Sequence, residues 1–450
     1  MDVVSGATLT SQAILDAAAK AVKESGVDPA KFLLVPAGAA VKKAADSKLS
    51  VQIVVLGSGA AGMAAALSAA ENGASNIVLL EKQQMLGGST GRSSGCILHA
   101  TDEKDKLNNF PPQALYDFWM SRSNGKADPA LIRKIAKNSK ATFEWVRDAG
   151  VKFSSFKPVY PGYAPLHLEN PDPKGGFVRT NGMLIVEALK NKAEKLGLKI
   201  MTGTAGESLI CEDGKVVGVV AKRTDGRTVT IRSQAVVLAT GGYDHNLDMV
   251  RQYARPTAAV LSQTGEGNNG DGLRMGQEIG ADTLFRYGKG GIVTVKVDAT
   301  ANMPKSFLYV DGLEAAVKNG KALKADSLSA PAQKMRIDAD NFAKTVTRCN
   351  NLTQDVDFGK APDLMKGIRK APFYAVRAEP EVIGTFGGLR INTDGQVLRG
   401  GKPVAGLYAA GEVANGVLYD DSYSYTGTAI QTALSTGRFA GTHAAKTLKK

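Results

Sequence analysis

The sequence VQIVVLGSGAAGMAAALSAAENGASNIVLLE at residues 51–81 begins with an apolar run and continues into a glycine-rich turn. Residues 51–56 are nearly all apolar, which is typical of a parallel strand buried on both faces. After the turn Gly57-Ser58-Gly59-Ala60-Ala61-Gly62, an alanine-rich segment predicts a helix, and residues 76–81 predict a second buried strand. A strand, a glycine turn, a helix and a second strand indicate a dinucleotide-binding unit.

A physical reason explains why each of these positions in the turn is a glycine. Gly57 permits the tight turn, Gly59 lets a pyrophosphate approach the backbone, and Gly62 lets the helix pack on the strand. The N-terminus of the helix favours the phosphate charge. Glu81, at the end of the second strand, is placed to accept hydrogen bonds from ribose hydroxyls. A glycine turn that binds nothing is the alternative, and this context argues against it.

Further elements follow from periodicity and turn residues. The pattern predicts helices at residues 128–149, with Asp128 as the N-cap, and at 184–196; a β-meander at 207–232 with turns at Asp213-Gly214 and Asp225-Gly226; a strand at 235–239; a hairpin around Asp394-Gly395 within 388–398; and a final helix at 428–446.

Composition excludes several classes of protein. A chain of 450 residues with 43% hydrophobic and 22% charged residues is long enough for two or three globular domains. No apolar run is long enough for a transmembrane segment. The three cysteines, Cys96, Cys211 and Cys349, do not form a disulfide or thiolate-metal pattern, so no metal site is expected.

The net charge of +13 comes from basic residues that are scattered along the chain. Nucleic-acid binding normally needs them clustered, so no nucleic-acid partner is expected. Met1 is followed by Asp2 rather than by a basic and then an apolar region, which argues against a signal peptide. The chain as it stands is therefore expected to be cytoplasmic, although a cell-envelope location is compatible with a longer parent protein.

A second small-residue loop, MLGGSTGRSSG at residues 85–95, can follow phosphates and the edge of an isoalloxazine ring, which favours FAD over NAD. With this loop, the sequence resembles the flavoprotein subunits of fumarate reductase and succinate dehydrogenase, a family that includes soluble fumarate and urocanate reductases and 3-ketosteroid dehydrogenases. The segments GSGAAG, LLEK, LGGST, LATGG, NGDG and GLYAAGE occur in the family's order.

The resemblance implies an α/β fold, in which a doubly wound FAD-binding domain is interrupted by a smaller α+β capping domain. The implied organisation is a remnant of an FMN-binding domain at 1–25, a linker at 26–49, the FAD-binding domain at 50–285 and 373–450, and a shortened capping domain at 286–372. The implied FAD contacts are Gly57, Gly59, Ala61, Gly62, Glu81, Lys82, Gly88, Ser89, Thr90, Gly95, Ala205, Asp271, Glu412, Thr428 and Ile430. Asp271 has a second interpretation as a simple helix N-cap.

The N-terminal segment SGATLTS, residues 5–11, resembles the motif at which a transferase links FMN to a threonine, here Thr10. The domain that binds FMN lies mainly upstream of this motif in the family. We therefore expect Thr10 to be unmodified in this chain, with FMN present only in a longer parent protein. The alternative is a cap of serines and threonines for the following helix.

The substrate clamp of the family is incomplete here. Gly384 stands where the family has a histidine, and Ser424 stands where it has an arginine. His99, His167, His245 and His443 miss the family's catalytic positions, and the capping segment lacks the family's Asn-x-x-Gly-x-Arg-Phe stretch, so the usual proton donor has no counterpart.

The segment GTFGGL, residues 384–389, is closer to the ketosteroid dehydrogenase version, which addresses a ketone oxygen with a backbone N–H and tyrosines. By that resemblance the candidate catalytic residues are Tyr425, Tyr423, Tyr374, Gly384 and Thr385. Each tyrosine has a second interpretation as a packed aromatic residue.

The expected activity is FAD-dependent reduction of a C=C bond conjugated to a carboxylate or carbonyl, by hydride transfer from FAD N5. The expected partners are a small unsaturated acid or enone and an electron donor, which would be a reduced flavin, an NADH-linked protein or a membrane redox protein. The alternatives are a ketosteroid dehydrogenase-like enzyme and a catalytically silent FAD-binding electron-relay protein.

Overall fold

The computed structural model describes residues 45–101, 110–156, 168–171, 181–254, 261–285, 292–295, 322–357, 367–376, 381–420 and 423–448, with single residues at 20, 24, 317, 318, 320, 362 and 365. Contacts divide the chain into residues 1–45 with 225–227 and residues 46–224 with 228–450. All elements named below belong to the second unit. No helix of the described ranges combines the length and the apolar character that crossing a bilayer requires. Thr10 lies outside the described residues.

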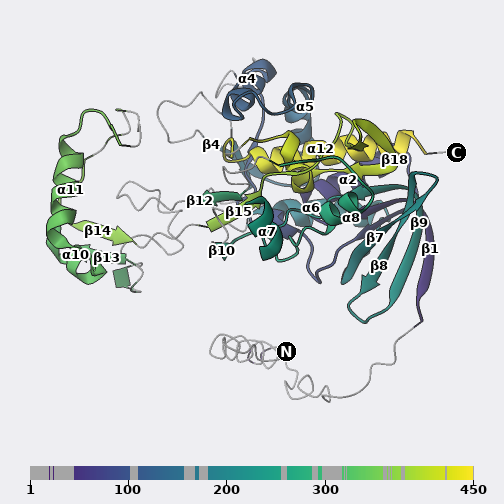
Figure 1. Ribbon diagram of the computed structural model, residues 1–450, viewed down its shortest axis with the longest axis horizontal. Coiled ribbons are helices and arrows are strands. Elements are labelled where there is room, and N and C mark those ends of the chain that lie inside the picture. The colour runs from purple at the N-terminus through teal and green to yellow at the C-terminus, as the bar shows by residue number, and fades with distance from the viewer. Residues whose placement is uncertain are drawn as a thin grey trace. The chain divides into compact units, whose positions relative to one another are not determined.

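A central sheet carries the fold (Figure 1). Its strand order is β17-β18-β9-β1-β2-β6. The strands β18, β9, β1, β2 and β6 are parallel, and β17 pairs antiparallel with β18 at the edge. Their bounds are β1 Ser47–Leu56, β2 Ile77–Leu80, β6 Lys199–Met201, β9 Thr228–Leu238, β17 Gln396–Arg399 and β18 Lys402–Ala409.

Both faces of the sheet are covered, which explains why its strands are continuously apolar. In β1, Ile53 and Val55 belong to the core shared with the helices, whereas Val54 and Leu56 belong to the core shared with the meander and the loops after β9. The second half of β9 alternates in the same way. The strand pattern therefore produces two hydrophobic cores, one on each face of the sheet.

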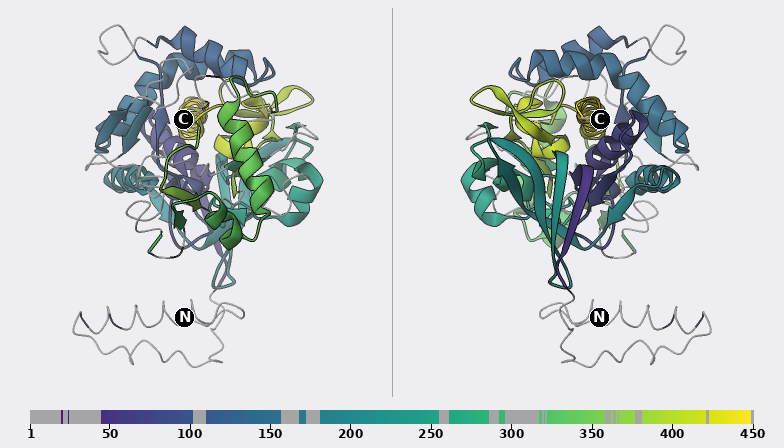
Figure 2. Two further views of the ribbon diagram at one scale, coloured as in Figure 1. Left: turned by 90° about the vertical axis from the view of Figure 1, so that its left-hand side faces the viewer. Right: turned by 90° about the vertical axis from the view of Figure 1, so that its right-hand side faces the viewer.

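The expected meander is confirmed as β7 (Thr204–Glu212), β8 (Lys215–Arg223) and the first half of β9. The separate strand expected at 235–239 is a continuation of β9, which is 11 residues long. Its first half pairs with β8, and its second half pairs with β18. This long strand joins the meander and the parallel strands into one sheet of eight strands (Figure 2).

Four helices contribute to the core that contains Ile53 and Val55. They are α2 (Ala60–Glu71), α5 (Pro129–Asp148), α6 (Gly182–Lys195) and α12 (Thr428–Lys446). Asp128 caps α5 as expected, since its carboxylate accepts a hydrogen bond from Leu131 N at 2.9 Å. The helices α2 and α12 lie against each other at very short range: a Cβ on Gly437 or Gly441 would clash with a carbonyl oxygen of α2. The remaining helices of this part are α3 (Gly88–Gly91), α4 (Pro112–Arg122), α7 (Leu247–Tyr253) and α8 (Asp271–Glu278), with the short 3-10 turns η5 (Gly411–Val413) and η6 (Asn415–Val417).

Small sheets surround the large one. One has the order β10-β15-β12, with β10 at Leu261–Ser262, β12 at Ile292–Val295 and β15 at Glu381–Thr385; a second joins β3 (Ile97–Leu98), β5 (Leu168–Pro171) and β4 (Phe153–Phe156). The hairpin around Asp394-Gly395 is shorter than expected. Gly388 and Leu389 form β16 and pair with β11 (Thr283–Leu284) instead, because Gly387 and Gly388 have positive φ and turn the chain aside.

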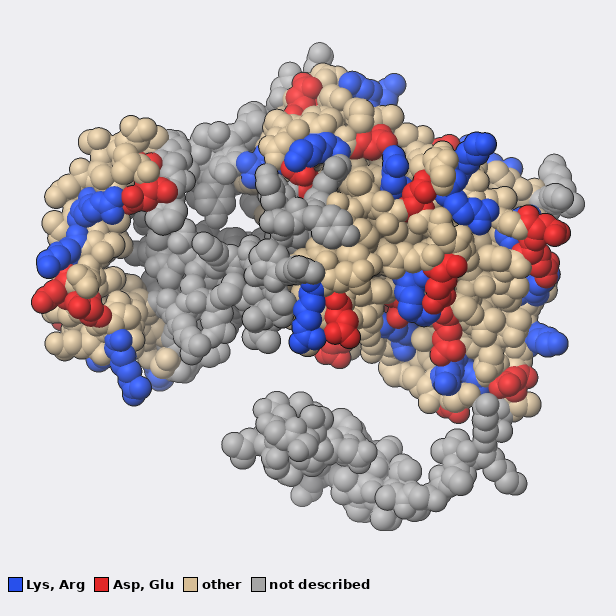
Figure 3. Space-filling view, in the orientation of Figure 1, with Lys and Arg blue, Asp and Glu red and all other residues tan. Residues whose placement is uncertain are grey.

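In the segment expected to cap the site, β13 (Ala322–Ala325) pairs with β14 (Phe373–Val376), which lies just beyond the expected end of that segment at residue 372. The helix α10 (Ser329–Met335) packs with α11 (Ala339–Asn351) and with this strand pair. This part of the chain has the α+β character that was predicted. On the face drawn in Figure 3, Lys and Arg side chains of the described residues alternate with Asp and Glu. This mixture fits the scattered charges of the sequence.

Candidate functional site

The glycine turn joins β1 to α2 at the carboxyl edge of the sheet. Gly57 has φ +104°, and a Cβ there would clash with the Ala239 carbonyl. A Cβ on Gly62 would clash with the Gly57 carbonyl. Gly59 differs, because its Cβ would approach no described atom closer than 3.7 Å, at Thr90 Oγ1. Packing within the protein does not require Gly59 to be small, whereas a pyrophosphate that passes close to the backbone does.

Glu81 is buried and fastens this turn to the next loop. Its Oε2 accepts hydrogen bonds from Ser58 N at 3.0 Å and Ser58 Oγ at 2.6 Å, and its Oε1 accepts one from Gln83 N at 2.8 Å. Ser58 Oγ in turn accepts a hydrogen bond from Gly87 N at 3.0 Å. A carboxylate has about four acceptor sites. The three used here leave Oε1 room for about one ribose hydroxyl, fewer than the sequence suggested.

Lys82 and Asp271 contact each other directly. Lys82 Nζ lies 2.6 Å from Asp271 Oδ2, and both side chains are partly buried. Asp271 is the first residue of α8, and Gly270 with φ +79° takes the N-cap position without a side-chain hydrogen bond. The interpretation of Asp271 as an N-cap is therefore wrong, and the residue pairs with a second predicted FAD contact.

The loop predicted to follow the phosphates is held from both sides. Thr90 Oγ1 accepts a hydrogen bond from Ala60 N, the first residue of α2, at 2.9 Å. Ser89 Oγ accepts hydrogen bonds from Gly265 N at 3.2 Å and Asn268 Nδ2 at 3.1 Å. Nothing within 4 Å crowds a Cβ on Gly88. These residues line a backbone turn beside the first turn of α2.

Other predicted FAD contacts have packing roles. A Cβ on Gly95 would lie 2.7 Å from Pro171 Cγ, so tight packing already requires a glycine there. Thr428 Oγ1 accepts a hydrogen bond from Trp119 Nε1 at 3.1 Å at the start of α12. Ala61 and Ile430 belong to the core shared by α2 and α12, and Ala205 pairs with Lys222 in the meander. Whether these residues touch FAD stays a prediction.

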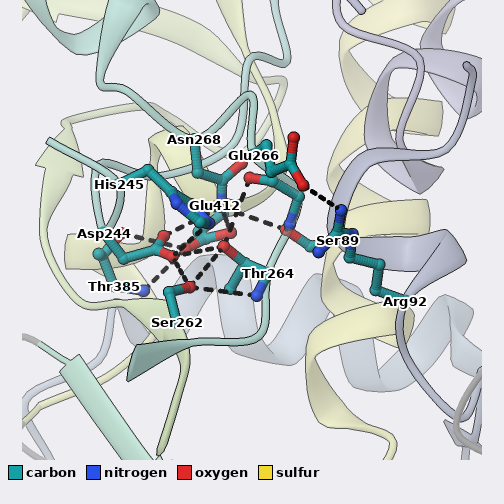
Figure 4. A network of polar contacts seen from close by, with 11 residues as sticks. Ser89, Arg92, Asp244, His245, Ser262, Thr264, Glu266, Asn268, Thr385 and Glu412 are labelled. Carbon is teal, nitrogen blue, oxygen red and sulfur yellow. Dashed lines mark hydrogen bonds and ion pairs between the residues drawn. The ribbon is translucent and has the colours of Figure 1, made fainter. Parts of the chain in front are cut away.

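A buried polar cluster lies where β10, β15, η5 and the loop after β9 meet (Figure 4). Asp244 accepts hydrogen bonds from the hydroxyls of Ser262 and Thr264 through Oδ2 and from Asn268 Nδ2, at 3.1 Å, through Oδ1. His245 Nε2 lies 3.8 Å from the same carboxylate. We call Asp244, Asn268, Thr385 and Glu412 the acid cluster.

Glu412 is the second acid of this cluster. Its Oε1 accepts hydrogen bonds from Thr385 N at 2.7 Å and Thr385 Oγ1 at 3.1 Å, and its Oε2 accepts one from Asn268 Nδ2 at 3.2 Å. Burial, and secondarily the nearby Asp244, raise the pKa of Glu412 from its usual 4.5 to about 8. Glu412 is therefore largely protonated at neutral pH.

Gly384 and Thr385 lie directly against Glu412. A Cβ on Gly384 would lie 3.2 Å from Glu412 Oε1, so a larger side chain there would press on the carboxyl group. Thr385 is fully buried, and its carbonyl accepts a hydrogen bond from Asn415 Nδ2 at 3.0 Å. The structure thus joins two residues predicted to be catalytic with one predicted to contact FAD.

The predicted tyrosines do not form one group. Tyr423 is 6.0 Å from Tyr419, whose ring is 5.1 Å from Phe386, and we call these three residues the aromatic row. Tyr423 Oη accepts a hydrogen bond from Ala429 N at 2.9 Å, and burial raises the pKa of its hydroxyl well above the usual value. The catalytic roles of Tyr423, Tyr425 and Tyr374 stay predictions.

The other two predicted tyrosines, Tyr425 and Tyr374, contact residues outside the aromatic row. Tyr425 meets Phe118 of α4 edge-on at 6.0 Å. Tyr374 belongs to β14, where Lys324 Nζ lies 5.6 Å from its ring centre.

The segment that carries Tyr423 and Tyr425 is anchored by Asp420. This buried carboxylate accepts hydrogen bonds from Lys126 Nζ and Asn124 Nδ2, both at 3.0 Å. Arg122 Nε also donates to the Ser424 carbonyl at 3.2 Å. Ser424, which replaces the expected arginine, is buried under this contact. Asp420 was not predicted from the sequence.

The described histidines have structural surroundings. His99 stacks on Phe143 at 4.3 Å, and His443 Nδ1 lies 3.0 Å from Tyr408 Oη. His167 lies outside the described residues. Among the three described histidines, His245 is the one that lies near the acid cluster, with its Nε2 3.8 Å from the Asp244 carboxylate.

Comparison with known proteins agrees with this geometry. A family model for the FAD binding domain matches residues 52–286 and 286–429. The chain is 26% identical to the NADH:fumarate oxidoreductase of Klebsiella pneumoniae, over 99% of the chain but only 52% of that protein. It is 28% identical to the vinyl phenol reductase of Lactiplantibacillus plantarum, over 88% of the chain and 97% of that protein.

A solved structure of a flavocytochrome c3 fumarate reductase in its open conformation is also similar, with a TM-score of 0.69 and 25% identity over 88% of this chain and 78% of that one. The chain spans about half the length of the first relative.

Proposed function

Because the chain belongs to the family of FAD binding domains, we propose that it is an FAD-dependent oxidoreductase that reduces a C=C bond conjugated to a carbonyl or a carboxylate. The observation that carries this proposal is the open space at Gly59 within an otherwise tightly packed turn. The relatives support the reaction class, since both act on unsaturated compounds by their names.

The described residues fit FAD. The turn at Gly59 and the N-terminus of α2 would hold the pyrophosphate, Glu81 would hold a ribose hydroxyl, and the loop with Ser89 would follow the phosphates. Bound FAD, once reduced, supplies the hydride. The electrons would come from a separate donor, either a reduced flavin, an NADH-linked protein or a membrane redox protein.

The substrate is a larger and less charged alkene than fumarate. Gly384 and Ser424 provide no charged donors for two carboxylates, and an unpaired buried carboxylate costs about 1–3 kcal/mol or more. The aromatic row near Thr385 suits an aryl group instead. We therefore propose an aryl alkene with one carboxylate, or an enone.

An anaerobic reoxidation assay tests this function. The purified flavoprotein is reduced chemically and mixed with fumarate, an aryl acrylate, a non-steroidal aryl enone, a vinyl phenol or a steroid enone, while the flavin absorbance is followed. We expect rapid reoxidation by the aryl acrylate or the aryl enone and slow reoxidation by fumarate. A response to the steroid enone alone would favour the ketosteroid dehydrogenase alternative, and no response to any compound would favour a silent electron-relay protein.

The tyrosine assignment is tested in the same assay. Tyr425→Phe removes one hydroxyl and keeps the ring, so it should slow the best substrate if that hydroxyl binds it. Tyr116→Phe is the matched control, because the Tyr116 ring on α4 contacts Arg133 at 3.9 Å. Equal rates of flavin reoxidation in the two variants would show that the Tyr425 hydroxyl does not bind the substrate.

A further inference from the structure

The acid cluster contains a buried carboxyl group, Asp244, and a partly buried one, Glu412, that share one donor. Asn268 Nδ2 lies 3.1 Å from Asp244 Oδ1 and 3.2 Å from Glu412 Oε2. Two carboxylates in a buried site cannot both stay charged without cations beside them. Among the described residues, His245 is the one basic side chain within ion-pair distance of either acid. Even a charged imidazole would balance one carboxylate, so one acid must keep a proton.

The position of the basic side chain places this proton on Glu412. His245 Nε2 lies 3.8 Å from Asp244 Oδ2, and no other described basic side chain comes this close to Glu412, so the negative charge is better stabilised on Asp244. Each acid accepts three hydrogen bonds, so their number does not distinguish the two. Glu412 receives one backbone N–H from Thr385, and the Thr385 hydroxyl can reverse and accept a hydrogen bond from a protonated Glu412.

The other groups around the acid cluster do not change its net charge. Tyr419 faces Glu412 with a neutral phenol, since burial keeps its pKa well above the usual value. Farther out, Arg92 is already paired with Glu266 at 2.8 Å, and both of these side chains are exposed. In the described part of the chain, the charge at the cluster is thus set by Asp244, Glu412 and His245.

We propose that Asp244 is a positioning residue that keeps Glu412 protonated, so that the site presents FAD with a neutral carboxyl group rather than a carboxylate. This inference uses FAD binding and the predicted contact of Glu412 with FAD, and it does not need the proposed alkene reduction. FAD is itself an anion, so a second negative charge at the cluster repels it. FAD retention should therefore weaken when Glu412 ionises, and it should do so with a one-proton dependence.

The test measures FAD dissociation from the purified flavoprotein between about pH 6 and about pH 9, by flavin fluorescence. In the unchanged protein, the dissociation constant should rise with pH by up to about tenfold per unit once Glu412 ionises. Glu412→Gln replaces a neutral acid by a neutral amide, so it should keep its FAD at neutral pH within about twofold and lose the pH dependence. Asp244→Asn should move the onset of FAD loss to lower pH, because Glu412 then ionises more readily.

Glu266→Gln is the matched control, since it removes an acid on the neighbouring exposed loop and should leave the profile unchanged. The proposal is overturned if Glu412→Gln loses FAD at neutral pH as strongly as Glu412→Ala, because Glu412 would then act as a carboxylate acceptor. It is also overturned if Asp244→Asn leaves the profile unmoved. Failure of every alkene in the reoxidation assay would reject the proposed function and leave this result standing.

Discussion

At the scale of single residues, Gly59 and Gly62 look alike in the sequence but have different neighbours. A Cβ on Gly62 would clash with the Gly57 carbonyl, whereas a Cβ on Gly59 has space around it. Gly62→Ala should therefore destabilise the flavin-free protein by about 1–3 kcal/mol. Gly59→Ala should leave that stability nearly unchanged but weaken FAD binding. Chemical unfolding of the flavin-free variants and titration with FAD measure the two effects.

Equal loss of stability in both variants would contradict the ligand role of Gly59. Loss of FAD by Gly62→Ala alone would do the same.

The residues that the sequence did not reveal are those without a periodic or motif signal. Ser58 is a non-glycine position of the turn, and its bond to Glu81 appears only when the two strand ends lie side by side. Asp244 carried a usable signal, because it follows the TGG turn at the carboxyl edge of a strand, where α/β sheets bind ligands. Asn268 could not be identified, since its two acidic partners lie 24 and 144 residues away.

At the scale of elements, Asp420 fastens the tyrosine segment to the turn after α4. Asp420→Asn removes a buried charge that binds Lys126 and Asn124, so it should lower the free energy of unfolding by about 1–3 kcal/mol. Asp394→Asn is the control, because its pair with Lys134 is about one-third to two-fifths exposed and should contribute about 0–1 kcal/mol. Denaturant unfolding of the two variants checks the difference. Similar values for both would show that Asp420 is no special anchor.

Elements with strong periodicity were predictable, and those set by distant contacts were not. The strand β1, the meander turns, α5 and α12 follow from buried runs, Asp-Gly turns and an N-cap. The pairing of Gly388 with β11 could not be foreseen, because positive φ at two glycines and the nearby Val413 carbonyl decide it. The pairing of one long strand β9 with both β8 and β18 was missed for a similar reason. The strand β8 directly precedes β9 in the chain, whereas β18 follows it far downstream.

At the scale of the whole molecule, the raised pKa of Glu412 makes stability depend on pH. The unfolded carboxyl group has its usual pKa of 4.5, and the folded one is raised to about 8. The folded state therefore binds more protons in this window, so the stabilising contribution is complete below 4.5 and is lost as pH rises through 8.

The free energy of unfolding should fall between these values, and Glu412→Gln should flatten the fall. Denaturant unfolding at several pH values, with and without FAD, measures it. A wild-type slope that persists in Glu412→Gln would assign the effect to another group.

The contact between α2 and α12 joins two parts of the chain that the ribosome synthesises at widely separated times. Asn72 Nδ2 donates to Thr442 Oγ1 across 370 residues, and the glycines of α12 lie on the backbone of the helix that follows the glycine turn. During synthesis, β18 can complete the sheet beside β9 once residue 409 is made, but α2 is covered only after the ribosome has passed residue 446 at the end of α12. A nascent chain stalled before α12 would therefore leave the apolar face of α2 open to chaperones.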